Sequence, residues 1–211
     1  MRLGLCYLFL LIALTVLLTP EIASSEPRLT VSNIYNDDGY LCVDFRLYEG
    51  IDAELLRDLK DGIPALLRYR VDLWLDRSNW YDKLITSVSF SYRINYDNWD
   101  TVYCVTPLGA DTERKIGTTD VAELIHLVCN QQRMEVCPLR MLDSLADYYV
   151  TVTAEIRSLS ADRVREIDSW LGGDEDDKGG GLLGFIVGLF GSRSKSAEIK
   201  SRVFNLKGLS R

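Results

Sequence analysis

The body of this chain alternates apolar and polar residues with a period of two, and no other feature restricts its fold as strongly. Successive side chains of a strand point to opposite faces, so such segments predict strands with one buried face and one wet face. Strands of this kind form antiparallel sheets, whereas strands of parallel sheets are covered on both faces. The clearest alternating segments are residues 41–48, 67–75, 87–94 and 148–157, with shorter candidates at 29–34, 101–106 and 133–137.

Short helical segments interrupt these strands. The first is predicted to begin at Asp52, which suits an N-cap, and the second begins at Asp120, where Glu123 makes a capping-box-like pair. A third stretch with helical spacing of apolar residues covers 161–171. About seven strands joined in this way predict an all-β fold, an antiparallel immunoglobulin-like β-sandwich with two or three short crossover helices.

The 211 residues divide into three regions. Residues 1–25 are predicted to be a secretory signal peptide, because a basic residue precedes a long apolar run and small residues precede the expected cleavage site. Retention of this segment as a membrane anchor is the alternative. Residues 26–171 are predicted to form the β-sandwich domain, and residues 172–211 to form an acidic, glycine-rich linker, a short apolar segment and a basic tail.

The charge of the chain restricts its partners. The 31 acidic and 24 basic residues give a formal charge of −7, whereas a nucleic-acid-binding domain usually carries a basic face. We therefore expect no nucleic-acid partner. The charge is uneven, however, because most of the charged residues between 191 and 211 are basic.

An apolar run lies just before these basic residues. Apolar residues beside basic ones are typical of segments that bind an anionic membrane surface, although the run is too short to span a membrane as a helix. The alternative is that the run packs back onto the domain. The possible membrane contacts are Leu182, Leu183, Phe185, Ile186, Leu189, Phe190, Arg193 and Lys195.

Four cysteines follow the predicted signal peptide, at Cys42, Cys104, Cys129 and Cys137. An even number of cysteines in an exported chain favours disulfides. The short spacing favours a Cys129–Cys137 bond, and Cys42–Cys104 is then the remaining pair. Free buried thiols and a metal site are the alternatives, and the spacing does not suit the usual zinc motifs.

Candidate catalytic chemistry is sparse. His126 is the single histidine of the chain, and the sequence places no serine or cysteine nucleophile beside it. No glycine-rich phosphate loop and no ordered set of calcium ligands is present in the sequence. We therefore predict no catalytic residues, no metal site and no cofactor, and we expect that the protein is not an enzyme.

Aromatic and basic residues suggest a possible interaction surface. Arginine and exposed aromatic residues are enriched at the energetically important positions of protein interfaces. The alternative is that the aromatic side chains close the ends of the sandwich. The candidate residues are Arg68, Arg70 and Trp74 on one face of a predicted strand, and Trp80, Tyr81 and Trp99 in the turns beside it.

Several segments, in order, carry a resemblance to a known family. They are residues 59–64 (LKDGIP), 68–74 (RYRVDLW), 90–96 (FSYRINY), 101–105 (TVYCV) and 148–152 (YYVTV). Over roughly residues 28–171 the chain resembles the exported bacterial proteins called domain of unknown function 4390. The resemblance implies a small exported β-rich domain with no assigned activity, among proteins that often resemble neighbours of membrane-bound sensor kinases of the nitrogen-regulation type.

These observations lead to one expected function and one alternative. We expect a non-enzymatic protein-interaction domain of the cell envelope, in the periplasm or at the extracytoplasmic face of the inner membrane. Such a domain would dock a sheet face or edge onto an envelope protein, for example a membrane sensor kinase. The alternative is a peripheral membrane or lipid-binding protein that acts through the apolar and basic C-terminal segment.

Overall fold

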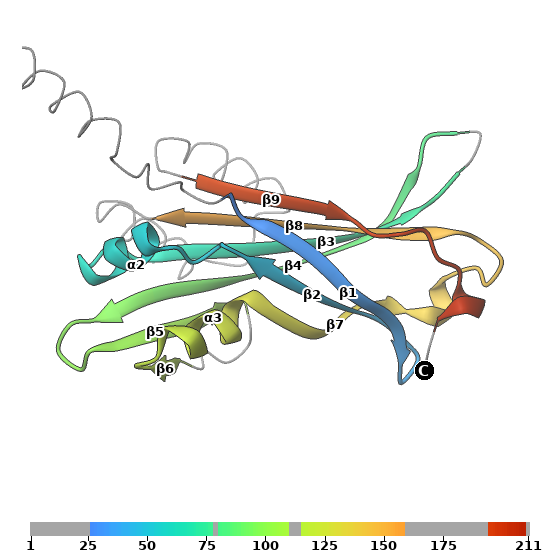
Figure 1. Ribbon diagram of the computed structural model, residues 1–211. Helices are drawn as coiled ribbons and strands as arrows, with labels where there is room; N and C mark the ends of the chain where they lie inside the picture. Colours follow the sequence, from blue (N-terminus) through green and yellow to red (C-terminus); the bar gives the residue numbers. More distant parts are fainter. Residues whose placement is uncertain (1–25, 78–79, 110–114, 159–193, 210–211) are drawn as a thin grey trace, which may run out of the picture.

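The computed structural model describes residues 26–77, 80–109, 115–158 and 194–209 (Figure 1). Four predicted features lie outside these ranges: the signal peptide at 1–25, the third helical stretch at 161–171, the acidic, glycine-rich linker that begins at 172, and the apolar segment at 182–190 with Arg193.

The described chain forms two antiparallel sheets (Figure 1). The smaller sheet has the order β1 (Arg28–Asp37), β2 (Tyr40–Tyr48) and β7 (Asn130–Pro138). The larger sheet has the order β6 (Ile116–Thr118), β5 (Val102–Leu108), β4 (Lys83–Asp97), β3 (Ala65–Leu75), β8 (Tyr148–Ser158) and β9 (Ser194–Lys200). The predicted all-β antiparallel sandwich is confirmed, whereas its immunoglobulin-like character stays a prediction.

The hydrophobic core lies between the two sheets. Tyr69 on β3 is fully buried, and its ring centroid lies 5.2 Å from that of Phe45 on β2 and 5.1 Å from that of Phe90 on β4. The alternating residues of β3 that share the face of Tyr69 are also buried, while Arg68 and Arg70 lie on the opposite face. The period-two pattern therefore reflects one core-facing side of each central strand.

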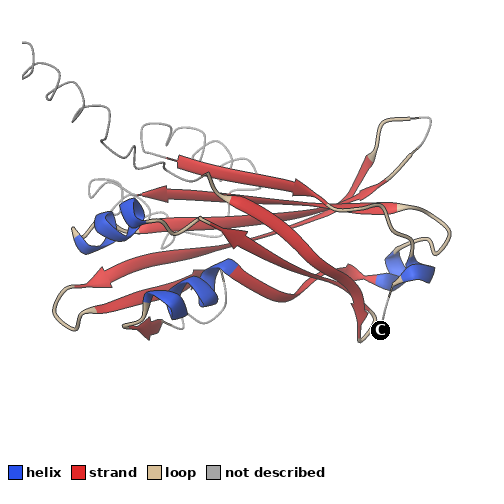
Figure 2. Cartoon of the chain, in the orientation of Figure 1, coloured by secondary structure: helices blue, strands red, loops and turns tan. Residues whose placement is uncertain are grey.

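Two helices carry the chain between the sheets (Figure 2). Helix α2 (Ala53–Lys60) follows β2, and helix α3 (Val121–Cys129) precedes β7. As predicted, Asp52 and Asp120 are the N-caps, and each side chain accepts a hydrogen bond from a backbone N–H of the first turn. The capping-box prediction for Glu123 is wrong, because its carboxylate instead accepts a hydrogen bond from the hydroxyl of Thr118. No helix within the described residues is long and apolar enough to cross a membrane.

Residues 194–209 differ from the basic tail that the charge pattern predicts. Strand β9 pairs with β8 from Thr151 to Arg157, and Phe204 forms a further bridge with Tyr148. Two single-turn helices, η1 (Leu139–Met141) and η2 (Leu206–Gly208), complete the described elements. The folded domain therefore extends well beyond residue 171, because a strand near the end of the chain supplies an edge of the larger sheet.

Candidate functional site

The hairpin that joins β3 to β4 carries the exposed aromatic residues of one end of the molecule. The side chains of Trp80 and Tyr81 are 74% and 88% exposed, and Leu84 at the start of β4 is also exposed. Figure 1 shows this hairpin projecting beyond the rest of the sandwich. Covering a large aromatic side chain with a partner is favourable, because its apolar surface is removed from water. This end of the molecule is therefore suited to binding a protein surface.

A stack of aromatic rings fixes the base of the hairpin. Trp74 on β3 lies opposite Tyr149 on β8, and the two rings stack with centroids 6.3 Å apart. The indole N–H of Trp74 donates a hydrogen bond to Oγ1 of Thr151 at 3.0 Å. On the adjacent strand β9, the ammonium group of Lys200 lies 3.5 Å from the centroid of the Tyr149 ring, a cation–π contact. Three strands therefore contribute to one rigid support.

A carboxylate continues this support into the hairpin itself. The Tyr149 hydroxyl donates a hydrogen bond to Oδ2 of Asp82 at 2.8 Å, and Oδ1 of Asp82 accepts a hydrogen bond from the backbone N–H of Arg77 at 3.1 Å. Burial and the neighbouring Asp82 raise the pKa of Tyr149 to about 12, while the hydrogen bond from Tyr149 lowers the pKa of Asp82. At neutral pH the phenol is thus a proton donor and the carboxylate is charged.

The arginines of the predicted surface lie on the outer face of the larger sheet. Nε of Arg70 lies 2.9 Å from Oδ2 of Asp72, and Asp72 also accepts a hydrogen bond from the hydroxyl of Ser87. Arg68 lies opposite Ser91 on β4 and Glu155 on β8. These side chains extend along the strands from the position of Trp74 and share its face.

Trp99 does not join this surface. It is 97% exposed in the turn between β4 and β5, at the opposite end of β4 from Trp80. Since β4 has 15 residues, the two ends are separated by about 45 Å. The six predicted residues therefore form two sets. Five of them lie on the outer face of the larger sheet or in the hairpin, and Trp99 lies apart from them.

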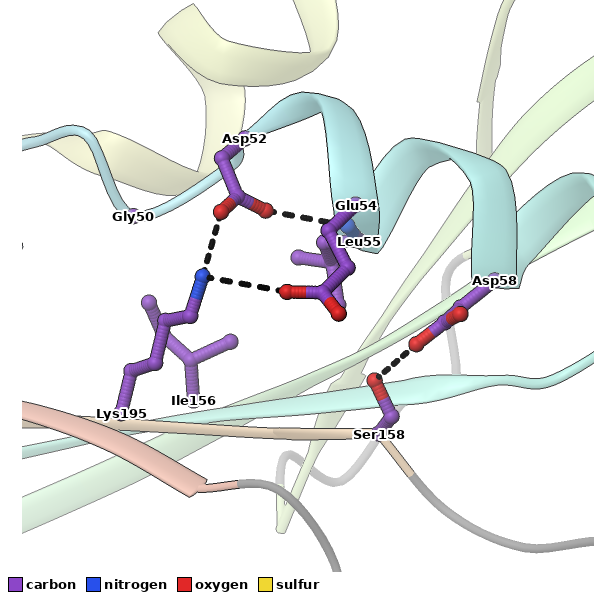
Figure 3. Close-up of a pocket in the computed structure, with 8 residues that line it drawn as sticks. All are labelled: Gly50, Asp52, Glu54, Leu55, Asp58, Ile156, Ser158 and Lys195. Atoms are coloured by element: carbon purple, nitrogen blue, oxygen red, sulfur yellow. Dashed lines mark hydrogen bonds and ion pairs between the residues drawn. The ribbon is translucent and has the colours of Figure 1, made fainter. Parts of the chain in front are cut away.

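A small pocket lies beside the N-terminus of α2 (Figure 3). Lys195 on β9 forms ion pairs with Asp52 and, at 3.9 Å, with Glu54. Nearby, the hydroxyl of Ser158 donates a hydrogen bond to Asp58 at 2.9 Å. The pocket has a volume of about 20 Å³, far below the roughly 300–1,000 Å³ of small-molecule sites, so it suits a water molecule rather than a substrate.

The ion pair at this pocket gives Lys195 a role inside the domain. Partial burial alone raises the pKa of Asp52, but hydrogen bonds from Lys195 and from the backbone N–H of Leu55 outweigh this effect and hold the pKa below its ordinary value. Lys195 was predicted as a membrane contact. In the structure it joins β9 to α2, and the other predicted membrane contacts lie outside the described residues.

The predicted disulfides are not present: all four cysteines are buried as free thiols. The prediction for Cys129 and Cys137 is wrong because β7 runs between them, and eight extended residues separate their Cα atoms by about 25 Å. A disulfide needs Cα atoms within about 7 Å. Cys42 and Cys104 lie in different sheets. Within the described ranges, no group of three or more His, Cys, Asp or Glu side chains is arranged to hold a metal ion.

Sequence reasoning missed Asp82, Tyr149 and Lys200 as parts of this surface. Their contacts join residues that are far apart in the chain, and register between strands decides which side chains meet. One signal was available for β9, where Ala197 and Ile199 alternate with polar neighbours as in a strand with one covered face.

The described chain is therefore an antiparallel β-sandwich domain that presents an aromatic hairpin rather than an enclosed pocket of substrate size. A family model, Domain of unknown function (DUF4390), matches residues 24–161, and the chain belongs to this family. No curated protein and no solved structure matches the chain significantly.

Proposed function

We propose that this protein is a non-enzymatic interaction domain that docks onto another protein of the cell envelope through the β3–β4 hairpin and the neighbouring outer face of the larger sheet. The predicted signal peptide supports export, and the resemblance to exported bacterial proteins favours the periplasm or the extracytoplasmic face of the inner membrane. A membrane sensor kinase is one candidate partner.

The observation that carries this proposal is the exposure of Trp80 and Tyr81 at the end of a hairpin whose base is fixed. An aromatic side chain with few rotatable bonds loses little conformational entropy on binding, and burial of its ring is strongly favourable. A fixed base reduces the entropy loss further, because the contacts at the base of the hairpin are already formed before the partner binds.

The position of Lys195 makes protein docking a better candidate than membrane binding. This residue contributes to the predicted membrane-binding segment, yet its ammonium group is engaged by Asp52 and Glu54. The charged residues of the hairpin, Asp76, Arg77, Asp82 and Lys83, sum to zero, so the hairpin has no net charge that would attract an anionic membrane surface.

Capture from a membrane-and-periplasm extract tests this proposal. Purified protein should recover a specific envelope protein, and the double variant W80A/Y81A should lose most of that recovery because the aromatic contacts are removed. The variant W99A is the matched control, since Trp99 is even more exposed and lies at the opposite end of β4. Equal recovery by all three proteins would contradict docking through the hairpin.

A further inference from the structure

Within the described part of the chain, strand β4 has an unpaired edge directly after the aromatic hairpin. β4 runs from Lys83 to Asp97, but β5 pairs only with residues Ser91–Asp97. Gly109, with a φ of +82°, turns the chain after β5, and the chain then returns as β6 on the far side of β5. Among the described strands, none pairs with the edge of β4 between Lys83 and Phe90.

From Thr86 to Phe90, this edge lacks the features that usually protect a strand edge from pairing. Residues 84–90 (LITSVSF) contain no charge, no proline and no glycine, and they are rich in β-branched residues. A register shift lies near Ile85, and the pairing of residues 86–90 with β3 is regular after it. A free, regular edge of this kind can accept an added strand by backbone hydrogen bonds.

The other edges of the two described sheets carry protective features. The edge strand β1 is interrupted by a register shift between Val31 and Asn33 and has a charged residue at each end, Arg28 and Asp37. The edge strand β9 carries three charged residues, Lys195, Glu198 and Lys200, while β6 has only three residues. β7 has two register shifts against β2, and its Arg133 has a left-handed φ of +55°. The contrast points to the β4 edge as a surface that is left open for a partner.

The side chains beside this edge indicate the chemistry of the added strand. Val88 and Phe90 are half-buried and share the core-facing side of β4, so inward residues of an added strand would be apolar. On the outer face, Ser87 and Ser89 are short and exposed, and Arg68 and Arg70 lie on the next strand. Long acidic side chains at the outward positions could reach across these serines to the arginines.

We infer that the β4 edge from Thr86 to Phe90 accepts an extended segment of another protein in which apolar and acidic residues alternate. This inference rests on the proposed docking function and specifies its mode, namely strand addition next to the hairpin. The exposed Trp80 and Tyr81 then cover the partner at the end of the added strand. A second copy of this chain is the competing occupant, since its own uncharged edge could pair with this one.

The test uses the full mature chain and a synthetic eight-residue peptide of alternating Glu and Val, with amide chemical shifts as the readout. Binding should perturb the amides of residues 86–90 and leave those of β9 unchanged. N-methylation of the peptide amides at one set of alternate positions should weaken binding by at least about tenfold, because two or more backbone hydrogen bonds are lost, whereas the other set should be tolerated. A scrambled peptide with all Glu residues before all Val residues is the control.

A charge variant tests the recognition of the acidic residues. Arg68→Gln should weaken binding of the alternating peptide by up to about fivefold, and the matched variant Lys207→Gln, which removes one exposed positive charge elsewhere, should not. Equal weakening by both variants would overturn the assigned role of Arg68.

The outcomes separate this inference from the proposed function. If envelope capture depends on Trp80 and Tyr81 but the alternating peptide fails to bind, or binds as well as the scrambled peptide, strand addition is overturned and docking through the hairpin stands. A chain that sediments as a dimer through the β4 edge would also overturn the inference, because the second copy then occupies it. If the peptide binds but envelope capture does not depend on Trp80, strand addition at the β4 edge stands and the proposed docking through the hairpin is overturned.

Discussion

The rings of Trp74 and Tyr149 stack with their planes inclined by only 10°, because the two residues lie opposite each other on β3 and β8. Tyr149 also donates a hydrogen bond to Asp82, which lies in the hairpin beyond Trp74. One residue of β8 therefore holds both sides of the hairpin that presents Trp80 and Tyr81. This support fixes the base of the hairpin that carries the two exposed aromatic residues.

The variant Tyr149→Phe should loosen the hairpin without unfolding the sandwich. It keeps the ring that stacks on Trp74 but removes the hydrogen bond to Asp82. The same Asp82 carboxylate also accepts a hydrogen bond from the backbone N–H of Arg77. We expect faster hydrogen exchange at the Arg77 amide and unchanged exchange in β3. Tyr40→Phe is the control, because Tyr40 is an exposed tyrosine at the start of β2. Unchanged exchange in the Tyr149 variant would show that the hairpin does not depend on this bond.

The ion pair between Lys195 and Asp52 should make part of the stability depend on acid pH. The pKa of Asp52 is lowered in the folded protein, so this contribution is fully present above the ordinary Asp pKa of about 3.9 and is lost as the pH falls through the folded value. Lys195→Met should cost about 1 kcal/mol at pH 7 in urea unfolding.

The difference between the Lys195→Met variant and the wild type should shrink as the pH falls below about 3.9, because protonated Asp52 no longer attracts the ammonium group. Lys207→Met is the control, since Lys207 is exposed in η2. If the difference in unfolding free energy stays constant as the pH falls below the pKa of Asp52, Lys195 stabilises the domain by packing alone.

The hydroxyl of Tyr69 should stabilise the junction between the larger sheet and α3. It donates a hydrogen bond of 2.8 Å to the carbonyl oxygen of Val128, and burial raises the pKa of this phenol, so the group stays a donor. Tyr69→Phe should lower the free energy of unfolding by about 1 kcal/mol. The amide of Gln131 still donates to the same oxygen, which limits the loss. A loss as small as that of Tyr40→Phe would contradict this role.

The thiols should be free in the folded protein. Burial raises the pKa of Cys129 to about 12 and raises that of Cys137, so neither is a thiolate at neutral pH. Mass mapping of the native protein under non-reducing conditions should find no Cys129–Cys137 peptide, and alkylation should require denaturant. A Cys129–Cys137 disulfide in active exported protein would contradict the extended geometry of β7.

The period-two alternation of apolar residues was sufficient to predict the central strands but not the strands beside them. β3 alternates because the residues on one of its faces lie in the core, although Asp72 on the other face is also buried, and the predicted aspartates cap both α2 and α3. The charge of residues 194–200 concealed β9, because an edge strand exposes one face and one side to water and tolerates lysines. The Cys129–Cys137 prediction relied on short spacing along the sequence, but the residues between the two cysteines form the extended strand β7.

The surface was predictable only in part. The alternation placed Arg68, Arg70 and Trp74 on one face, but the grouping of Trp80 with Tyr149 and the separation of Trp99 depend on strand direction and register. These are long-range properties that no local pattern contains. The same is true of the open β4 edge, because it arises from the difference in length between β4 and β5.

Photo-crosslinking in intact cells tests the central claim most directly. A photoreactive amino acid at position 81 should give one discrete adduct with an envelope protein, and Trp80→Ala should reduce that adduct strongly. The same reagent at position 99, which is at least as exposed and lies at the other end of β4, should give no such adduct. An adduct of equal yield at both positions, or none at position 81, would contradict docking through the β3–β4 hairpin.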